Sequence, residues 1–181
     1  MKNIAEAHLL RLLPDAEDRQ TLINFLANVV KNPGKKQPFG VVLQGRQGIG
    51  KGFLQQWVAE LVGLEHSREI STWLRPWSEP PNWLDGCLLA YGDLPDPADL
   101  DTVRALVAAD KIAVQDGNGK PAEIQARANF LLTTSVYWEV PNDRRFTVLR
   151  TSVMHADFPA GHFADLAARG LADFKELIDH V

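Results

Sequence analysis

A glycine-rich stretch, Gly45-Arg46-Gln47-Gly48-Ile49-Gly50-Lys51-Gly52, carries the clearest chemical signal in the chain. Its glycines allow the backbone to curl so that successive N–H groups point at a single anion. The stretch follows an apolar run over residues 39–43 and opens an expected helix from Lys51 to Val62, whose N-terminus also attracts anions. It is therefore predicted to be a phosphate-binding loop, with Lys51 reaching the β- and γ-phosphates of a nucleotide.

The loop departs from the usual motif at its last position. The lysine is normally followed by Ser or Thr, whose hydroxyl binds Mg²⁺. Here Gly52 and then Phe53 follow it, and neither has a hydroxyl. The plain alternative is a glycine-rich turn between a strand and a helix, with an incidental lysine. The residues expected to contact the nucleotide are Gly45, Arg46, Gln47, Gly48, Ile49, Gly50, Lys51, Gly52 and Phe53.

An acidic residue after a second apolar run is the next feature of the chemistry. Asp93 follows the run over residues 88–91, where a carboxylate could hold Mg²⁺ through water or polarise an attacking water. Many ATPases place two adjacent acids here, whereas the neighbouring position in this chain is Gly92. A cap of the following turn is the structural alternative for Asp93.

Two further polar features are candidates to act on the phosphate. Ser135 follows Thr133 and Thr134 at the end of an apolar strand, where a hydroxyl could orient the attacking water. The alternative is that these hydroxyls bond their own backbone. Arg144 and Arg145 precede the last expected strand and could stabilise charge on the transferred phosphate, although a surface ion pair is the structural alternative.

The hydrophobic pattern supplies the elements that must position these residues. Helical periodicity is found in segments 4–13, 15–30, 51–62, 97–110 and 161–181, the last with a break expected at Gly170. Buried strands are expected at 39–43, 88–91, 130–134 and 146–149, and the Trp-containing segment 66–85 is predicted to be an irregular connection. Alternating strands and helices predict an α/β fold, with a mostly parallel central sheet and helices on both faces.

A turn signal indicates an insertion in this pattern. Asp116-Gly117-Asn118-Gly119 lies between the short runs 112–114 and 123–125, which predicts a β-hairpin. The phosphate-binding loop is expected at the carboxyl ends of the parallel strands, where such sheets bind ligands.

The composition is that of an ordinary globular domain. The chain has 181 residues, 45% hydrophobic and 23% charged, with a net charge of −4. We expect one domain, made of an N-terminal helical segment (1–35), the core (36–160) and a C-terminal helix packed on it (161–181). No apolar run is long enough to span a bilayer, and the single cysteine, Cys87, is predicted to be a core residue in a reducing cytoplasm.

Taken in order, these motifs resemble the superfamily 3 helicase core of phage and plasmid primase-helicases, an AAA+ type of P-loop NTPase close to the virulence-associated E group. The resemblance runs roughly from Asn24 to Arg150. It rests on the P-loop (42–52), the acidic strand (84–93), the hairpin segment (106–120), the sensor strand (129–135) and the arginine segment (140–148). The chain departs from the family where Asp93 replaces a usual Glu, Val136 a usual Asn, and Phe53 a frequent Ser or Thr.

The resemblance implies ATP and Mg²⁺ as cofactors, in the cytoplasm of a bacterial host cell. It implies a ring, usually a hexamer, with ATP between subunits, so that Arg144 or Arg145 acts on the neighbour's nucleotide. The hairpin would contact single-stranded DNA, and a primase or another replication protein would be a further partner. The residues expected to bind DNA are Lys111, Asn118, Lys120 and Arg127.

Three functions remain open from the sequence. The first is an ATP-dependent single-stranded DNA translocase, the helicase core of a mobile element's replication protein. The second is a nucleotide-binding assembly or DNA-holding module with weak or lost hydrolysis, which the residues at positions 53, 92, 93 and 136 favour. The third is a small-molecule kinase, against which the hairpin signal argues.

Overall fold

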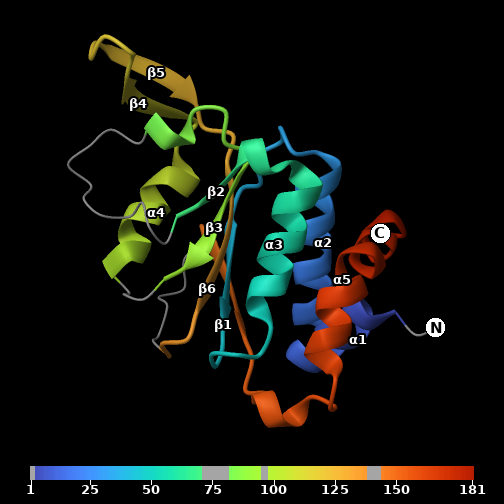
Figure 1. Ribbon diagram of the computed structural model, residues 1–181. Helices are drawn as coiled ribbons and strands as arrows, with labels where there is room; N and C mark the ends of the chain where they lie inside the picture. The colour runs from blue at the N-terminus through green and yellow to red at the C-terminus, as the bar shows by residue number, and fades with distance from the viewer. Residues whose placement is uncertain (1–2, 71–81, 95–97, 138–143) are drawn as a thin grey trace.

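A parallel five-stranded sheet forms the centre of the computed structural model, with the strand order β2-β3-β6-β1-β7 (Figure 1). The structure describes residues 3–70, 82–94, 98–137 and 144–181. The strands are β2 (Ser67–Glu69), β3 (Leu89–Asp93), β6 (Asn129–Thr134), β1 (Gly40–Gln44) and β7 (Phe146–Arg150). All their pairings are parallel, so their carboxyl ends meet at one edge of the sheet.

The interior strands β1 and β6 are buried along their whole length because both faces of the sheet are covered. Every residue of β1 and β6 is buried, as expected for a parallel sheet between two layers of helices. Register places Val42 opposite Leu132 on β6 and Val148 on β7. Side chains alternate between the faces, so Leu43 belongs to one hydrophobic core and Val42 to the other.

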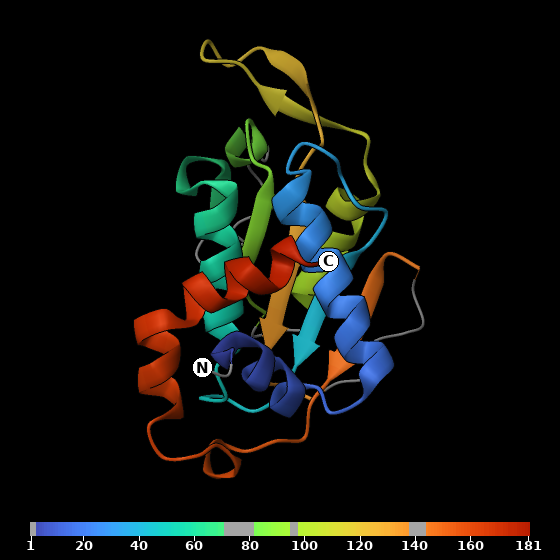
Figure 2. The same ribbon diagram turned by 90° about the vertical axis from the view of Figure 1, so that its right-hand side faces the viewer.

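Helices cover both faces, as the sequence predicted. α4 (Ala98–Ala108) packs on one face. The other face is covered by α1 (Ile4–Leu12), α2 (Ala16–Lys31), α3 (Lys51–Val62) and α5 (His162–Asp179), which lie in front of the sheet in Figure 2. Asn3 and Asp15 cap α1 and α2 by accepting hydrogen bonds from backbone N–H groups of the first turn. None of the described helices is long and apolar enough to cross a membrane.

The predicted β-hairpin is present as a separate antiparallel pair, β4 (Lys111–Gln115) and β5 (Pro121–Gln125). The Asp116 carboxylate accepts hydrogen bonds from the N–H groups of Asn118 and Lys120, which fixes the turn. The hairpin lies at the end of the molecule opposite the loop that follows β1 (Figure 1). Lys36 Nζ donates to the carbonyls of Leu106 and Ala109, and this ties the C-terminus of α4 to the segment before β1.

The structure corrects the secondary structure predicted from the sequence at two points. Residues 66–85 were expected to be irregular, but Ser67–Glu69 forms an edge strand, β2, too short for its pattern to be recognised. The expected break at Gly170 is wrong, because α5 is continuous from His162 to Asp179, although Figure 2 shows that its axis changes direction. A Cβ on Gly170 would lie 2.2 Å from Trp57 Cζ2, so this glycine serves the close approach of α3 and α5.

The remaining predictions concern Cys87, the Trp-containing and arginine segments, and the division of the chain into segments. Cys87 is buried and burial raises the pKa of its thiol to about 11, which agrees with the predicted core role. Trp73, Trp77 and the first part of the arginine segment, residues 140–143, lie outside the described residues. The segments at both ends of the chain pack into the same core as the sheet, and the division at residues 35 and 160 stays a prediction.

Candidate functional site

The glycine-rich loop begins where β1 ends, at the carboxyl edge of the sheet. Gly48 and Gly50 have φ values of +78° and +89°, a region that side-chain-bearing residues rarely adopt. Gly45 has a different role, since a Cβ there would lie 2.2 Å from Thr151 Cγ2. The glycine pattern of the motif therefore reflects two left-handed backbone positions and one close approach of two chain segments.

Lys51 is the first residue of α3 and is only 7% exposed. Its Nζ donates hydrogen bonds to the carbonyls of Gly45 at 2.6 Å and Arg46 at 2.7 Å. Burial lowers the pKa of the Lys51 ammonium, and the carboxylate of Asp93 acts in the opposite direction. The ammonium thus closes the loop on itself in this state, and an anion entering the loop would compete with the two carbonyls for it.

Asp93 ends β3 at the same edge of the sheet as the loop. Its Oδ1 accepts a hydrogen bond of 3.0 Å from the hydroxyl of Thr133, which is buried near the end of β6. β6 lies between β3 and β1, so its carboxyl end is next to both Asp93 and the glycine-rich loop. Of the three hydroxyl residues at the end of this strand, Thr133 is therefore the one that contacts Asp93.

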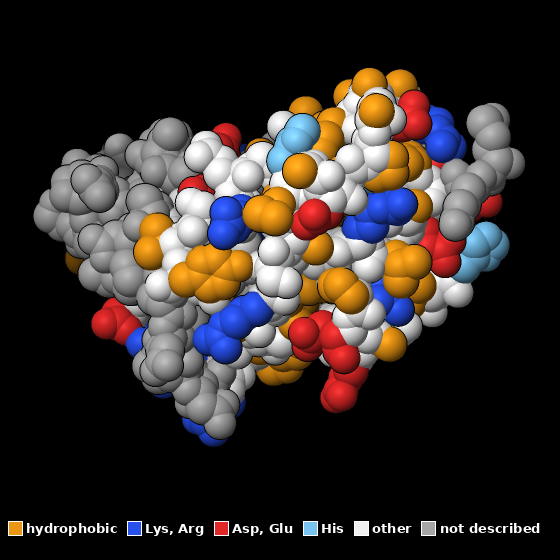
Figure 3. Space-filling model, turned by 90° about the horizontal axis from the view of Figure 1, so that it is seen from below, with side chains coloured by type: hydrophobic (Ala, Val, Ile, Leu, Met, Phe, Trp, Pro, Cys, Tyr) orange, Lys and Arg blue, Asp and Glu red, His pale blue; other side chains and the backbone are white. Residues whose placement is uncertain are grey.

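A pocket of about 470 Å³ joins these elements. Lys51, Asp93 and Ser135 all line it, so three residues predicted from different motifs meet in one place. Figure 3 looks onto this end of the molecule, where Lys and Arg side chains lie among hydrophobic ones. The other lining residues are Gln47, Gly48, Gly50, Gly52, Phe53, Gln55, Gln56 and Thr133.

Gln55 is a site residue that the motifs did not predict. It is buried, and its Nε2 donates to the carbonyls of Gly92 at 3.0 Å and Leu131 at 3.1 Å. These bonds hold α3 against β3 and β6 next to Asp93. Helical spacing was the available signal, because Gln55 follows Lys51 by four residues and so shares its face of α3.

A buried pair of histidines lies behind the loop. His8 on α1 is fully buried, and its Nδ1 lies 3.0 Å from Nε2 of His162 at the start of α5. A Cβ on Gly50 would lie 2.6 Å from His8 Cε1, so the imidazole packs directly against the loop. Burial lowers the pKa of His8 to about 4, and the nearby His162 shifts it in the same direction, so the pair is neutral near pH 7.

The predicted arginines lie far from the pocket of their own chain. Gly40 at the start of β1 donates its N–H to the carbonyl of Arg145, which places Arg144 and Arg145 at the amino edge of the sheet. A five-residue strand separates this edge from the loop, a distance of about 16 Å. Neither arginine can contact a phosphate held by its own loop without a large rearrangement, so any role on a nucleotide requires a second subunit.

The residues predicted to bind DNA lie on or beside the hairpin. Asn118 and Lys120 are exposed at its turn, and Arg127 is exposed just after β5. Lys111 is exposed on β4, with its Nζ 3.2 Å from Glu123 Oε2 across the pair. Part of the Lys111 charge is therefore offset within the hairpin, and Lys120 is the more available cation.

The donors in the pocket partly suit a nucleotide with Mg²⁺. Backbone N–H groups and Lys51 suit phosphates, and Asp93 supplies one carboxylate. Among the described residues there is no group of three or more acidic, His or Cys side chains that could hold a metal alone. Mg²⁺ commonly keeps several waters and takes further oxygens from phosphate, so one carboxylate fits a metal that arrives with the nucleotide.

Comparison with solved structures identifies the same overall fold in other proteins. The apo C-terminal region of NrS-1 matches 98% of this chain with a TM-score of 0.79 and 20% identity, and the match covers 45% of that chain. A second apo structure of this region gives a TM-score of 0.76 at 20% identity, covering 98% of this chain and 46% of that one. The JCV helicase, solved with a bound thiazolopyridine compound, matches 97% of this chain and 50% of its own, with a TM-score of 0.57 and 14% identity.

The chain shares its overall fold with the NrS-1 C-terminal region and with the JCV helicase. It spans about half the length of the solved chains that it matches. No protein-family model matches the sequence, and no curated protein does. At identities of 20% and below, the likeness establishes the architecture, and the chemistry must be argued from the residues of this chain.

Proposed function

We propose that this chain is the ATP-binding core of a single-stranded DNA translocase. The observation that carries the proposal is the convergence of Lys51, Asp93 and Ser135 on one pocket at the carboxyl edge of the sheet. The likeness to the JCV helicase supports it, as does a hairpin with an exposed lysine at the opposite edge. Together these features fit a protein that binds a nucleotide at one end and a nucleic acid at the other.

The residues of the pocket have distinct roles in this proposal. Backbone N–H groups of residues 46–52 and the Lys51 ammonium bind the phosphates, which a helix N-terminus also favours. Bound Mg²⁺ supplies charge neutralisation on the phosphates. Asp93 orients water or metal, with its own position set by Thr133. Ser135 faces the same space and orients the attacking water.

In the proposed assembly, several copies of the chain form a ring and ATP is bound between two neighbouring copies. Arg144 and Arg145 are remote from the loop of their own chain but belong to the amino edge, where a neighbouring subunit could use them. An arginine supplied by a second subunit stabilises the charge that develops on the transferred phosphate.

The second candidate is a nucleotide-dependent DNA-holding module with little hydrolysis. It is favoured by Gly52, which offers no hydroxyl to Mg²⁺, and by Gly92, which leaves Asp93 as a single acid in the strand. Both candidates require nucleotide binding, and they differ only in turnover.

Calorimetric titration with ATP and Mg²⁺ tests the shared part of both candidates. Lys51→Ala should abolish binding because the phosphates lose their main counter-charge, whereas Lys35→Ala removes an exposed lysine outside the pocket and should leave the affinity unchanged. Equal affinity of the two variants would exclude the pocket as the nucleotide site.

Salt-dependent binding tests the hairpin. Lys120→Ala should reduce the slope of log Kd against log salt for single-stranded DNA by about one, since one phosphate contact is lost. Lys175→Ala, an exposed lysine on α5, is the matched control. An unchanged slope in Lys120→Ala would remove the hairpin turn from the DNA path.

A further inference from the structure

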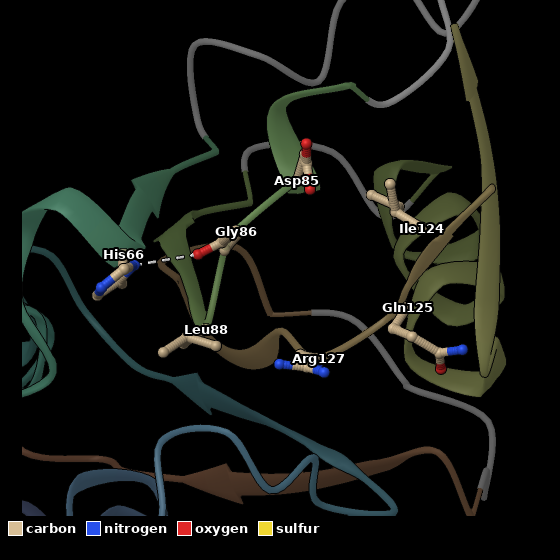
Figure 4. A pocket seen from close by; sticks show the side chains of 8 residues that line it. His66, Asp85, Gly86, Leu88, Ile124, Gln125 and Arg127 are labelled. Atoms are coloured by element: carbon tan, nitrogen blue, oxygen red, sulfur yellow. Dashed lines mark hydrogen bonds between the residues drawn. The ribbon is translucent and has the colours of Figure 1, made fainter. Parts of the chain in front are cut away.

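A second cavity, which we term the hairpin-base pocket, lies at the amino edge of the sheet. Its volume is about 440 Å³, within the range of about 300–1,000 Å³ that is usual for ligand sites. It shares no residue with the pocket that contains Lys51. Figure 4 shows the residues around it, which come from the turn before β2, the connection before β3 and the base of the hairpin: His66, Asp85, Gly86, Leu88, Ile124 and Arg127.

The walls of the hairpin-base pocket combine apolar and charged groups. The half-buried side chains of Leu88 and Ile124 approach it from opposite sides, and Ile124 points inward in Figure 4. Gly86 has a φ of +69°, and a Cβ there would meet nothing within 4 Å, so its backbone faces open space. The pocket therefore has an aliphatic interior with accessible backbone at one side.

Two charges of opposite sign remain uncompensated at its margin. Asp85 and Arg127 are both exposed, and within the described part of the chain neither side chain has a hydrogen bond or an ion pair. A charged side chain that lines a cavity without a partner is available to a ligand. His66 is less available, because its Nδ1 lies 3.3 Å from the carbonyl of Gly86.

The aliphatic walls and the two charged side chains of the hairpin-base pocket limit the classes of ligand that it could bind. A simple anion would be repelled by Asp85, and a purely apolar molecule would leave both charges unused. Bare metal binding is excluded by the donor set, since the described residues contain no cluster of three ligating side chains. A nucleotide unit uses all the groups: aliphatic walls for the base faces, a guanidinium for the phosphate and a carboxylate for an exocyclic amino group.

We propose that the hairpin-base pocket holds one unpaired base of the strand that the hairpin contacts. Arg127 binds the adjacent phosphate, and Asp85 accepts a hydrogen bond from the exocyclic amine of the base. This inference rests on the proposed function, because it assigns a base site to the same single-stranded DNA that Lys120 contacts. It adds a preference: cytosine, which carries an amine, is bound more tightly than thymine, which has only acceptors at that position.

Fluorescence anisotropy with oligo-dC and oligo-dT of equal length tests this preference in the full chain. The unmodified protein should bind oligo-dC about fivefold more tightly, the effect of one hydrogen bond of ordinary net strength to a solvent-exposed carboxylate. In Asp85→Ala the ratio of the two Kd values should fall close to one. Glu123→Ala is the matched control, since it removes another exposed acid of the hairpin region, one that does not line the pocket. Loss of its contact with Lys111 should change both affinities alike and so keep the fivefold ratio.

Photo-crosslinking gives a readout independent of affinity. Oligo-dC that carries one 5-iodocytosine should crosslink to peptides containing Leu88 or Ile124, identified by mass spectrometry. A Kd ratio near one in the unmodified protein, or crosslinks confined to the hairpin turn, would overturn the base site while leaving DNA binding and the proposed function intact. Failure to bind either oligonucleotide would reject the proposed function, and the base site with it.

Discussion

His8 Nδ1 lies 3.0 Å from His162 Nε2, in a buried contact that joins the first helix to the last. One neutral ring donates the shared hydrogen and the other accepts it. The same His8 ring packs against Gly50, where a Cβ would lie 2.6 Å from its Cε1. The glycine-rich loop that contains Gly50 is thus supported from behind by helices from both ends of the chain, a relationship that no local motif contains.

The first prediction concerns acid stability. Burial lowers the pKa of His8 from 6.5 to about 4, so below pH 6.5 the unfolded chain takes up a proton that the folded chain resists. Stability from this group is therefore lost as the pH falls, by about 2 kcal/mol between pH 7 and pH 5. Burial and the charge of Arg11 also lower the pKa of His162, while Asp165 opposes them, so His162 shifts stability in the same direction.

Urea unfolding at pH 7 and pH 5 measures this effect. His8→Asn should flatten the pH dependence, whatever its stability at pH 7, whereas His180→Asn at the exposed C-terminus should keep it. A pH dependence in His8→Asn equal to that of the unmodified protein would show that the buried pair does not resist protonation.

The second prediction compares two glycines of the loop. Gly50→Ala places a methyl group at a φ of +89° and against His8, so ATP affinity should fall at least about tenfold. Gly52→Ala should lower the affinity much less, because a Cβ added there would meet no atom within 4 Å, and should raise stability by about 1 kcal/mol as an exposed helical position. Calorimetric titration measures the ATP affinity of each variant, and thermal unfolding measures its stability. Equal affinities in the two variants would contradict the role of Gly50.

The third prediction concerns the metal. Gly52 occupies the position at which a hydroxyl normally binds Mg²⁺, and the space around it is open. Gly52→Ser should increase ATP affinity in Mg²⁺ several-fold relative to Gly52→Ala, with no difference between them in EDTA. If serine and alanine behave alike in Mg²⁺, the metal does not approach this position.

The fourth prediction tests the arginine in trans. Arg144→Ala should bind ATP normally, because its own loop lies about 16 Å away, but should lose turnover. Mixing it with Lys51→Ala should restore part of the activity, since some interfaces combine an intact loop with an intact arginine. No recovery at any mixing ratio, with assembly of the mixture confirmed by light scattering, would exclude Arg144 from a shared site.

The sequence predicted those parts of the molecule that local rules determine. The glycines of the loop and the hairpin turn each follow from residues close together in the chain, and the structure agrees. Asp93 and Ser135 were found because strand ends of a parallel sheet meet at one edge, where both line the pocket.

The features that the sequence did not predict depend on contacts between segments that are distant in the chain. β2 has only three residues, too few to display a pattern. The choice of Thr133 as the partner of Asp93 depends on strand register, which places them as direct neighbours. The His8–His162 pair spans 154 positions of sequence, so only the folded chain reveals it.

Measuring ATP hydrolysis with and without single-stranded DNA is the most direct test of the proposed ATP-dependent translocase activity. We expect turnover that DNA stimulates and that Lys51→Ala abolishes, with the same loss in Asp93→Asn. Nucleotide binding with no turnover, in the presence or absence of DNA, would contradict a translocase and leave the DNA-holding module. Turnover retained in Lys51→Ala would contradict the assignment of the pocket itself.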